Sequence, residues 1–331
     1  AIMIKKTLFD ELGGFDERYA PAYYEDTDLA LQIRDRGMSV IYQPLSKIVH
    51  FEGISSGTDL SSGVKAYQAI NGKKFLDRWK NRLSKHRPNA QEAFLEKDRD
   101  VVGRVLFVDA CTPTPDKDSG SIDVYNLLRI FIKMGWAVTF IPEDNYAYME
   151  KYTSALQRLG VHTLYHPYTR SVDEHVSQFG YHYDLVMLFR PQVVSKHLSA
   201  IRQYCPKAKV VYNTVDLHYL RIEREAELKN NQPLRNEAAQ MKQLERSLMD
   251  KVDLTTVVSS TELELLKRDG VNSVIHLPFS REVRSTTAEF EERTGILFVG
   301  GFQHTPNVDA VLYFVQEIMP LIRASGIDAK F

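Results

Sequence analysis

The sequence lacks several features that would identify a class of protein directly. Its only cysteines, Cys111 and Cys205, lie far apart without metal-ligand spacing, which is typical of reduced thiols in a cytoplasmic protein. Lys and Arg number 42 against 43 Asp and Glu, so the net charge of −1 provides no overall attraction for nucleic acid. No apolar run approaches the roughly 20 residues of a membrane span, and we expect neither such a span nor a signal peptide.

What the sequence does contain is ordinary for a globular protein. Hydrophobic residues make up 44% of the chain and charged residues 26%, and 331 residues are enough for two domains with separate cores. We find no internal repeat and no low-complexity tract. The sequence therefore has to be interpreted from its local patterns.

The clearest pattern is a β-loop-α-β unit over residues 104–142. A short apolar run, 104–109, has the length and composition of a strand that is buried on both faces. A loop rich in Pro, Asp, Ser and Gly follows over 110–120, and the helical spacing of residues 121–134 ends at Gly135. A second buried strand is predicted at 138–141. This unit predicts a right-handed crossover between parallel strands.

The alternation of strands and helices continues as far as residue 277. Further strands are predicted at 161–165, 184–189, 209–213, 254–258 and 274–277, with helices between them. A charged helical segment, 217–252, is broken near Pro233. Six or seven such strands predict an α/β fold with a Rossmann-like, doubly wound parallel sheet.

The two ends of the chain predict further pieces. Residues 1–83 suggest a smaller α/β piece, with a helix from Asp26 to Gly37, a strand at 39–42, and helical spacing over 64–83. Asn71-Gly72 interrupts that spacing, so one kinked helix or two short helices fit equally well. Residues 84–102 are polar and predict a linker. We therefore expect domains at 1–83 and 103–281, and a truncated start of a third at 282–331, with a strand from Gly295 and a helix at 308–323.

The first candidate site is the acidic cluster Glu25-Asp26-Thr27-Asp28. Acidic residues at a helix start cap free amides and complement the helix dipole, and spacing alone favours this structural interpretation. The functional alternative is a general base, because a carboxylate at a cavity edge can accept the proton of an attacking hydroxyl. His50 is a lone histidine, which is more often packed or exposed than a ligand, although beside carboxylates and a diphosphate it could complete a divalent-metal shell.

The second candidate is the loop that contains Asp118, Ser119 and Gly120. It is either a capped helix start, with Ser119 or Ser121 as the cap, or a site for an anion or a sugar at a helix N-terminus. The loop lacks the GxGxxG pattern, which disfavours NAD. Its position is suggestive, because ligands of such sheets bind at the carboxyl ends of the strands.

The third candidate follows the strand at 209–213, at the same edge of the sheet. Asp216 and His218 could bind sugar hydroxyls or transfer protons, and a salt-bridged helix start is about as good an interpretation. Arg190 follows another strand at this edge. With Asp118, Ser119 and Gly120, these residues form our predicted acceptor-binding set.

Two stretches resemble families of glycosyltransferases. Phe9-Asp-Glu-Leu-Gly-Gly-Phe-Asp-Glu-Arg-Tyr19 and Tyr24-Glu-Asp-Thr-Asp-Leu-Ala-Leu-Gln-Ile-Arg-Asp-Arg-Gly37 resemble the C-terminal part of family 2, which has the GT-A fold. This resemblance covers about residues 1–80. It implies that Asp26, in the Glu25-Asp26 pair, is the catalytic base of an inverting transfer, and that His50 assists a divalent metal, Mn or Mg, in the complete domain.

The remainder of the chain resembles family 4, which has the GT-B fold. The residues that carry this resemblance are Thr112 to Ser121, Asp216-Leu-His218, Val257-Val-Ser-Ser-Thr-Glu262 and Ile296 to Asp309. Tandem polypeptides of this kind occur in bacterial surface-polysaccharide assembly, which implies nucleotide-sugar donors and a growing glycan acceptor. Peripheral membrane association and homo-oligomerisation stay open.

The sequence also departs from both families. It lacks the nucleotide-binding half and the Asp-X-Asp motif of family 2, and nearly all of the C-terminal domain of family 4, with its Glu-X7-Glu segment. The usual Leu-Pro-Asn-Gly turn is replaced by Leu277-Pro-Phe-Ser280. We therefore expect a fragment that lacks both donor sites, binds no metal and has no turnover alone. The alternative is a non-catalytic glycan-binding or scaffolding module.

Overall fold

The computed structural model describes residues 2–43, 46–49, 59, 61–89, 91–144, 146–283, 285–286, 289–302 and 305–331. The chain divides into two compact units, Ala1–Arg99 and Asp100–Phe331. We call them the N-terminal unit and the sheet unit. Each is described by itself below.

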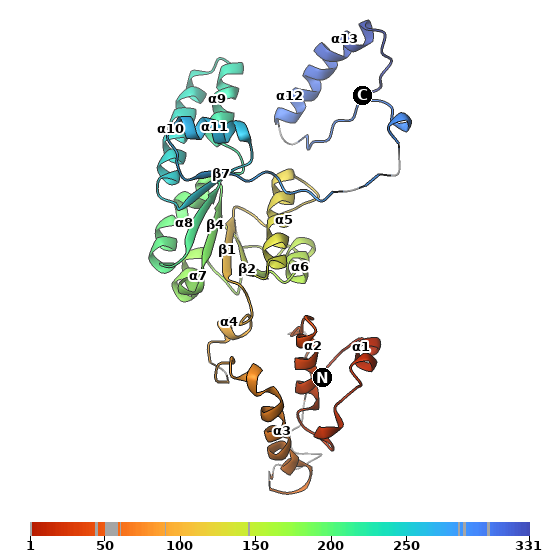
Figure 1. The fold of residues 1–331 in the computed structure, drawn as a ribbon. Helices are drawn as coiled ribbons and strands as arrows, with labels where there is room; N and C mark the ends of the chain where they lie inside the picture. Colours follow the sequence, from red (N-terminus) through yellow and green to blue (C-terminus); the bar gives the residue numbers. More distant parts are fainter. Residues whose placement is uncertain are drawn as a thin grey trace. The chain divides into compact units, whose positions relative to one another are not determined.

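The sheet unit is built on a seven-stranded parallel sheet in its described residues, with the strand order β3-β2-β1-β4-β5-β6-β7. Figure 1 shows helices on both sides of this sheet. The strands are β1 (Arg104–Asp109), β2 (Ala137–Pro142), β3 (His162–Thr163), β4 (Leu185–Phe189), β5 (Lys209–Asn213), β6 (Leu254–Val257) and β7 (Val274–His276). The predicted Rossmann-like α/β class is confirmed. The strand predicted at 161–165 is shorter than expected.

The helices of this unit fill the intervals between strands. They are α5 (Ser119–Lys133), α6 (Glu150–Arg158), α7 (Val172–Phe179), α8 (Pro191–Tyr204), α9 (His218–Leu228), α10 (Gln232–Met249) and α11 (Ser260–Arg268). The predicted break near Pro233 is confirmed: Asn231 caps α10 by accepting from the Leu234 amide at 3.1 Å, and Pro233 lies in the first turn, where it loses no helical bond.

The core of the sheet unit lies between the central strands and the helices beside them. Val105 and Phe107 of β1 are fully buried, and Phe107 stacks on Phe189 of β4 with ring centroids 5.7 Å apart. Val124 and Leu128 bring the apolar face of α5 onto these strands. Strands that are buried on both faces require apolar residues at successive positions, which explains the unbroken apolar runs in the sequence.

The residues after 282 contain helices but no strand in their described part. Helices α12 (Thr305–Tyr313) and α13 (Met319–Ala324), joined by the π-helical turn η5 (Phe314–Ile318), cover the predicted helix at 308–323. The predicted strand from Gly295 is wrong. The Ile296 amide donates to the Lys330 carbonyl at 2.7 Å, but no ladder extends from that bond, and Leu297 and Val299 stay exposed.

The N-terminal unit is helical in its described residues. It contains α1 (Lys6–Glu11), the 3-10 turns η1 (Glu17–Tyr19) and η2 (Gly63–Lys65), α2 (Glu25–Asp35), α3 (Ala66–Leu83) and α4 (Ala93–Glu96). Its core is formed by Tyr19, Leu31, Phe75 and Trp79. The predicted strand at 39–42 is wrong, because no described strand pairs with these residues and Ile41 and Tyr42 are exposed.

Candidate functional site

The acidic cluster begins helix α2, and its members differ in exposure. Asp26 is exposed, and its Oδ1 accepts from the amide of Thr27 at 2.7 Å. Glu25 is half-buried. The two residues before them, Tyr23 and Tyr24, have left-handed backbones with φ of 76° and 77°. The chain therefore enters α2 through a conformation that side chains other than glycine adopt at a cost.

Asp28 is the member of the cluster that our sequence analysis did not single out. Its carboxylate has no exposed surface, and it accepts from Tyr19 Oη at 3.0 Å, Trp79 Nε1 at 2.7 Å and Gln32 Nε2 at 2.7 Å. Arg78 lies 3.2 Å away and neutralises it. Asp28 precedes the buried Leu31 by three residues, so the helical spacing was the signal that it points inward.

In the sheet unit, Asp118 caps helix α5. Its carboxylate accepts from the Ser121 amide at 2.8 Å and from the Ser121 hydroxyl at 2.6 Å. The cap is therefore Asp118, and our assignment of the cap to Ser119 or Ser121 is corrected. Aspartate is the stronger choice because its carboxylate also complements the positive end of the helix dipole.

Arg190 connects this helix start to the end of strand β1. Its Nε donates to Oδ1 of Asp109 at 3.1 Å, and its backbone has a φ of 71°. Burial raises the pKa of the Asp109 carboxyl, and the nearby Arg190 partly offsets that rise. A Cβ on Gly120 would lie 3.8 Å from Arg190 Nη2 and 3.7 Å from Val215 Cγ1, so the ends of β4 and β5 meet the first turn of α5 here.

Asp216 and His218 lie just beyond the end of β5. His218 Nε2 is 3.2 Å from one carboxylate oxygen of Asp216, and Arg221 Nε is 3.3 Å from the other. Burial acts to raise the pKa of Asp216, but the bond from His218 and the charges of His218 and Arg221 outweigh it, and the pKa is lowered. Asp216 therefore stays ionised between His218 and Arg221.

Two acids from distant helices hold the start of α9, which has no cap of its own. Glu245 of α10 is fully buried and accepts from the amides of His218 at 3.2 Å and Tyr219 at 3.0 Å. Glu262 of α11 accepts from the Leu217 amide at 3.2 Å. Sequence reasoning missed the role of Glu245, because a cap supplied from another helix leaves no local pattern.

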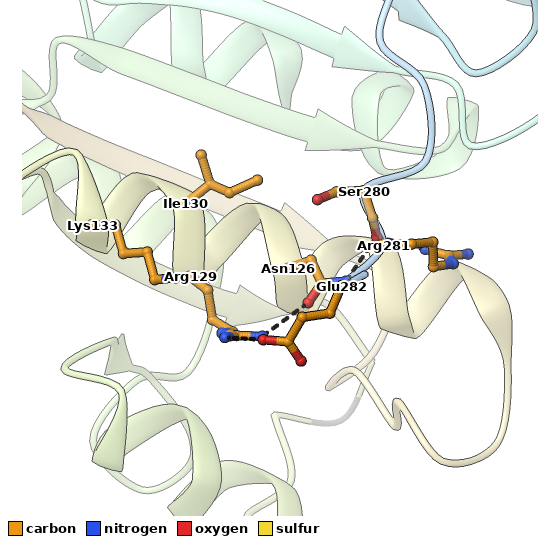
Figure 2. Close-up of a pocket in the computed structure, with 7 residues that line it drawn as sticks. All are labelled: Asn126, Arg129, Ile130, Lys133, Ser280, Arg281 and Glu282. Atoms are coloured by element: carbon orange, nitrogen blue, oxygen red, sulfur yellow. Dashed lines mark hydrogen bonds and ion pairs between the residues drawn. The ribbon is translucent and has the colours of Figure 1, made fainter. Parts of the chain in front are cut away.

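A small pocket lies on the outer side of α5 (Figure 2). It has a volume of about 120 Å³ and is lined by Asn126, Arg129, Ile130, Lys133, Ser280, Arg281 and Glu282. Asn126 Nδ2 donates to the Ser280 carbonyl at 2.7 Å, and Arg129 pairs with Glu282 at 2.9 Å. These contacts hold residues 280–282 against the helix. None of the predicted site residues lines this pocket.

The predicted metal residue, His50, lies outside the described residues. In the part of the chain that the structure describes, no group of three or more His, Cys, Asp or Glu side chains is arranged to hold a metal ion. A search of the same residues finds no helix with the length and apolar character needed to cross a membrane.

Comparisons with known proteins give a partial match to a glycosyltransferase. No family model matches the chain. Two curated proteins, the N-acetylglucosaminyl-diphospho-decaprenol L-rhamnosyltransferases of Mycobacterium tuberculosis strains CDC 1551 / Oshkosh and ATCC 25618 / H37Rv, are each 33% identical over 66 residues, 20% of this chain. The chain spans about a fifth of the length of these relatives (21%).

Among solved structures, a crystal structure of the glycotransferase of kitacinnamycin is similar over 58% of this chain and 56% of its own length, with 12% identity. Its TM-score of 0.30 is too low for this likeness to carry an argument. The likeness to glycosyltransferases therefore rests on the 66-residue match to the rhamnosyltransferases.

Proposed function

We propose that this chain is part of a glycosyltransferase that moves sugars from nucleotide-sugar donors to a growing surface glycan. The observation that carries the proposal is the 66-residue match at 33% identity to two rhamnosyltransferases. The resemblance of residues 1–80 to family 2 and of the sheet unit to family 4 supports two sugar transfers in one tandem polypeptide. The 331-residue chain alone is expected to turn over little or no substrate.

In the proposed reaction, Asp26 is the general base. An exposed carboxylate at the start of a helix can accept the proton of an acceptor hydroxyl whose oxygen attacks the anomeric carbon of the donor sugar, while the bond from that carbon to the nucleotide phosphate breaks and the nucleotide leaves. Asp28 does not suit that role, because its oxygens already accept three hydrogen bonds inside the protein. Holding donor and acceptor together is worth about 7–11 kcal/mol of the barrier, so one half of a site supplies little of it.

No step of the proposed reaction depends on a metal held by the described residues. A complete family 2 domain is expected to use Mn or Mg, but the described residues contain no group that fits such an ion. In the sheet unit, the proposed acceptor surface contains Asp118, Ser119, Gly120, Arg190, Asp216 and His218. Hydroxyl groups of a glycan would bind there through side chains and through the start of α5.

The test compares Asp26→Asn with Asp10→Asn in the longest natural polypeptide that contains this sequence. Asp10 is an exposed carboxylate of α1, in the same unit, and serves as a matched control. We expect Asp26→Asn to abolish one of two sugar transfers to a glycan acceptor, and Asp10→Asn to retain both. Transfer at the wild-type rate in Asp26→Asn would remove Asp26 as the base.

A binding assay distinguishes the glycosyltransferase hypothesis from the alternative of a non-catalytic glycan-binding module. Calorimetry of the 331-residue chain with nucleotide-sugars and Mn²⁺ is expected to show no tight binding, and micromolar affinity would contradict the absence of a donor site. Acceptor oligosaccharides that bind near Asp216 and His218, without any transfer by the longest natural polypeptide, would favour the binding module.

A further inference from the structure

One face of helix α3 contacts residues 19–28, the segment that contains Glu25 and Asp26. Asn71, Phe75 and Trp79 are spaced four residues apart and therefore share a face of the helix. Asn71 is fully buried, and its Nδ2 donates to the carbonyl of Tyr19 at 2.7 Å and to that of Ala22 at 2.8 Å. Trp79 Nε1 donates to Asp28 at 2.7 Å. The face thus contacts the segment on both sides of Glu25 and Asp26.

The middle of the segment also lies against this face. The ring of Tyr24 packs on Phe75 with centroids 5.1 Å apart. Gly72 makes room for that ring, because a Cβ at this position would lie 3.1 Å from Tyr24 Oη and 3.3 Å from its nearest ring carbons. Asn71-Gly72 therefore does not break the helix. Helix α3 runs unbroken from Ala66 to Leu83.

These contacts explain how the backbone can enter α2 in a strained conformation. Tyr23 and Tyr24 both have positive φ, which persists only when the surroundings impose it. Asn71 holds the carbonyl of Ala22 just before them, and Asp28, bonded to Tyr19 and Trp79, holds the first turn of α2 just after them. Asp26 lies between these two anchors.

We propose that Asn71 and Gly72 are positioning residues for Asp26. They contact no reacting group themselves. They set the backbone of residues 22–26, and with it the direction of the Asp26 carboxylate. This inference rests on the proposed role of Asp26 as a base. A displacement of about 1 Å in such a group can lower a rate about a hundredfold.

The substitution Gly72→Ala separates positioning from stability. Alanine is a better helix former than glycine, so the free energy of unfolding of the N-terminal unit should be maintained. The added methyl group must displace the Tyr24 ring by a few tenths of an ångström. If Gly72 served only the stability of the unit, Gly72→Ala would keep both its free energy of unfolding and its rate of sugar transfer. If it positions Asp26, we expect kcat to fall by about two- to fivefold with KM little changed.

The substitution Asn71→Ala tests the other anchor, with Asn81→Ala as the matched control from an exposed position of the same helix. In the 331-residue chain, hydrogen exchange of the Asp28 amide, which donates to the Tyr24 carbonyl at 2.8 Å, should accelerate about tenfold or more in Asn71→Ala and stay unchanged in Asn81→Ala. Unchanged exchange in Asn71→Ala would overturn the inference, whatever the chain catalyses.

Sugar transfer by the Gly72→Ala, Asn81→Ala and Asp26→Asn variants is then measured in the longest natural polypeptide. Loss of transfer in Asp26→Asn together with a wild-type kcat in Gly72→Ala would overturn the positioning role and leave the proposed function intact. Retained transfer in Asp26→Asn would instead overturn the proposed base, and the positioning role would fall with it. Loss of transfer in Asp26→Asn together with a kcat lowered by about two- to fivefold in Gly72→Ala, with Asn81→Ala fully active, supports the inference.

Discussion

Replacing Asp28 with asparagine should unfold the N-terminal unit far more readily than replacing Asp26, two residues away. Asparagine at position 28 would keep an acceptor for Tyr19 and Trp79, but its NH₂ group would face Gln32 Nε2 and the Arg78 guanidinium, which are both donors. The change also removes the buried one of the two carboxylates that pair with Arg78 and leaves only Asp16. Each buried donor that loses its acceptor costs about 1–3 kcal/mol, so the two donors together cost about 3–5 kcal/mol. We expect a loss of this size for Asp28→Asn, and less than about 0.5 kcal/mol for the exposed Asp26→Asn.

Tryptophan fluorescence can measure this difference, because the chain has only two tryptophans. In a Trp136→Phe background, Trp79 reports the N-terminal unit alone, and its indole donates directly to Asp28. For a unit of this size, 3–5 kcal/mol corresponds to a fall in Tm of at least about 12 °C. Urea denaturation followed at Trp79 gives the free energy of unfolding. A loss below about 1 kcal/mol for Asp28→Asn would refute the argument that the buried carboxylate organises this unit.

Two further predictions concern the sheet unit. Burial raises the pKa of Glu245 above its ordinary value of 4.5, against the opposing bonds from the amides of His218 and Tyr219. The folded unit then holds that proton more tightly than the unfolded chain, so the free energy of unfolding falls as pH rises from 4.5 through the folded pKa. Glu245→Gln should remove this part of the slope, measured by urea denaturation at several pH values; an unchanged slope would contradict it. Gly120→Ala should leave the thermal midpoint within about 2 °C, because its Cβ meets only ordinary contacts of 3.4 Å and longer. It should nevertheless weaken binding of acceptor oligosaccharides in calorimetry, and unchanged affinity would remove Gly120 from the acceptor surface.

The sheet could be predicted from the sequence because its signals are local. Apolar runs such as 105–108 and 185–189 have strand length, and helical spacing alternates with them. In a parallel sheet that is covered on both faces, each strand must be apolar at successive positions, so a single run carries the information. Right-handed connections restrict the possible strand orders, and the observed order came from the structure.

The two failed strand predictions show what a local pattern cannot contain. Residues 39–42 and 295–299 have β-branched and aromatic residues of strand type, yet a strand exists only where another strand pairs with it. In the described residues, 39–42 have no such neighbour, and 295–299 make a single bond, from Ile296 to Lys330. The partner of a strand depends on how the whole chain folds, and a pattern of four or five residues does not specify that partner.

The candidate sites likewise contain residues that local patterns predicted and residues that they did not. Arg190, Asp216 and Gly120 were placed at one edge of the sheet because each follows a strand of a parallel sheet, and the structure brings these residues together. The acids that hold Arg190 and the start of α9 did not follow from the sequence. Asp109 ends β1, Glu245 lies in α10 and Glu262 in α11, and each acts on a residue at least 27 positions away. Long-range hydrogen bonds of this kind leave no periodicity in the sequence.

This difference decides which substitutions can be interpreted chemically. Asp216 bonds His218 through one oxygen and Arg221 through the other, so Asp216→Asn would disturb both of these side chains and the start of α9 at once. Loss of activity in that variant would therefore not identify a proton-transfer group. Asp26 is exposed, and its carboxylate oxygen bonds the amide of the next residue. An asparagine keeps that acceptor and removes the base, so Asp26→Asn isolates the chemistry in a way that no acid at the sheet edge allows.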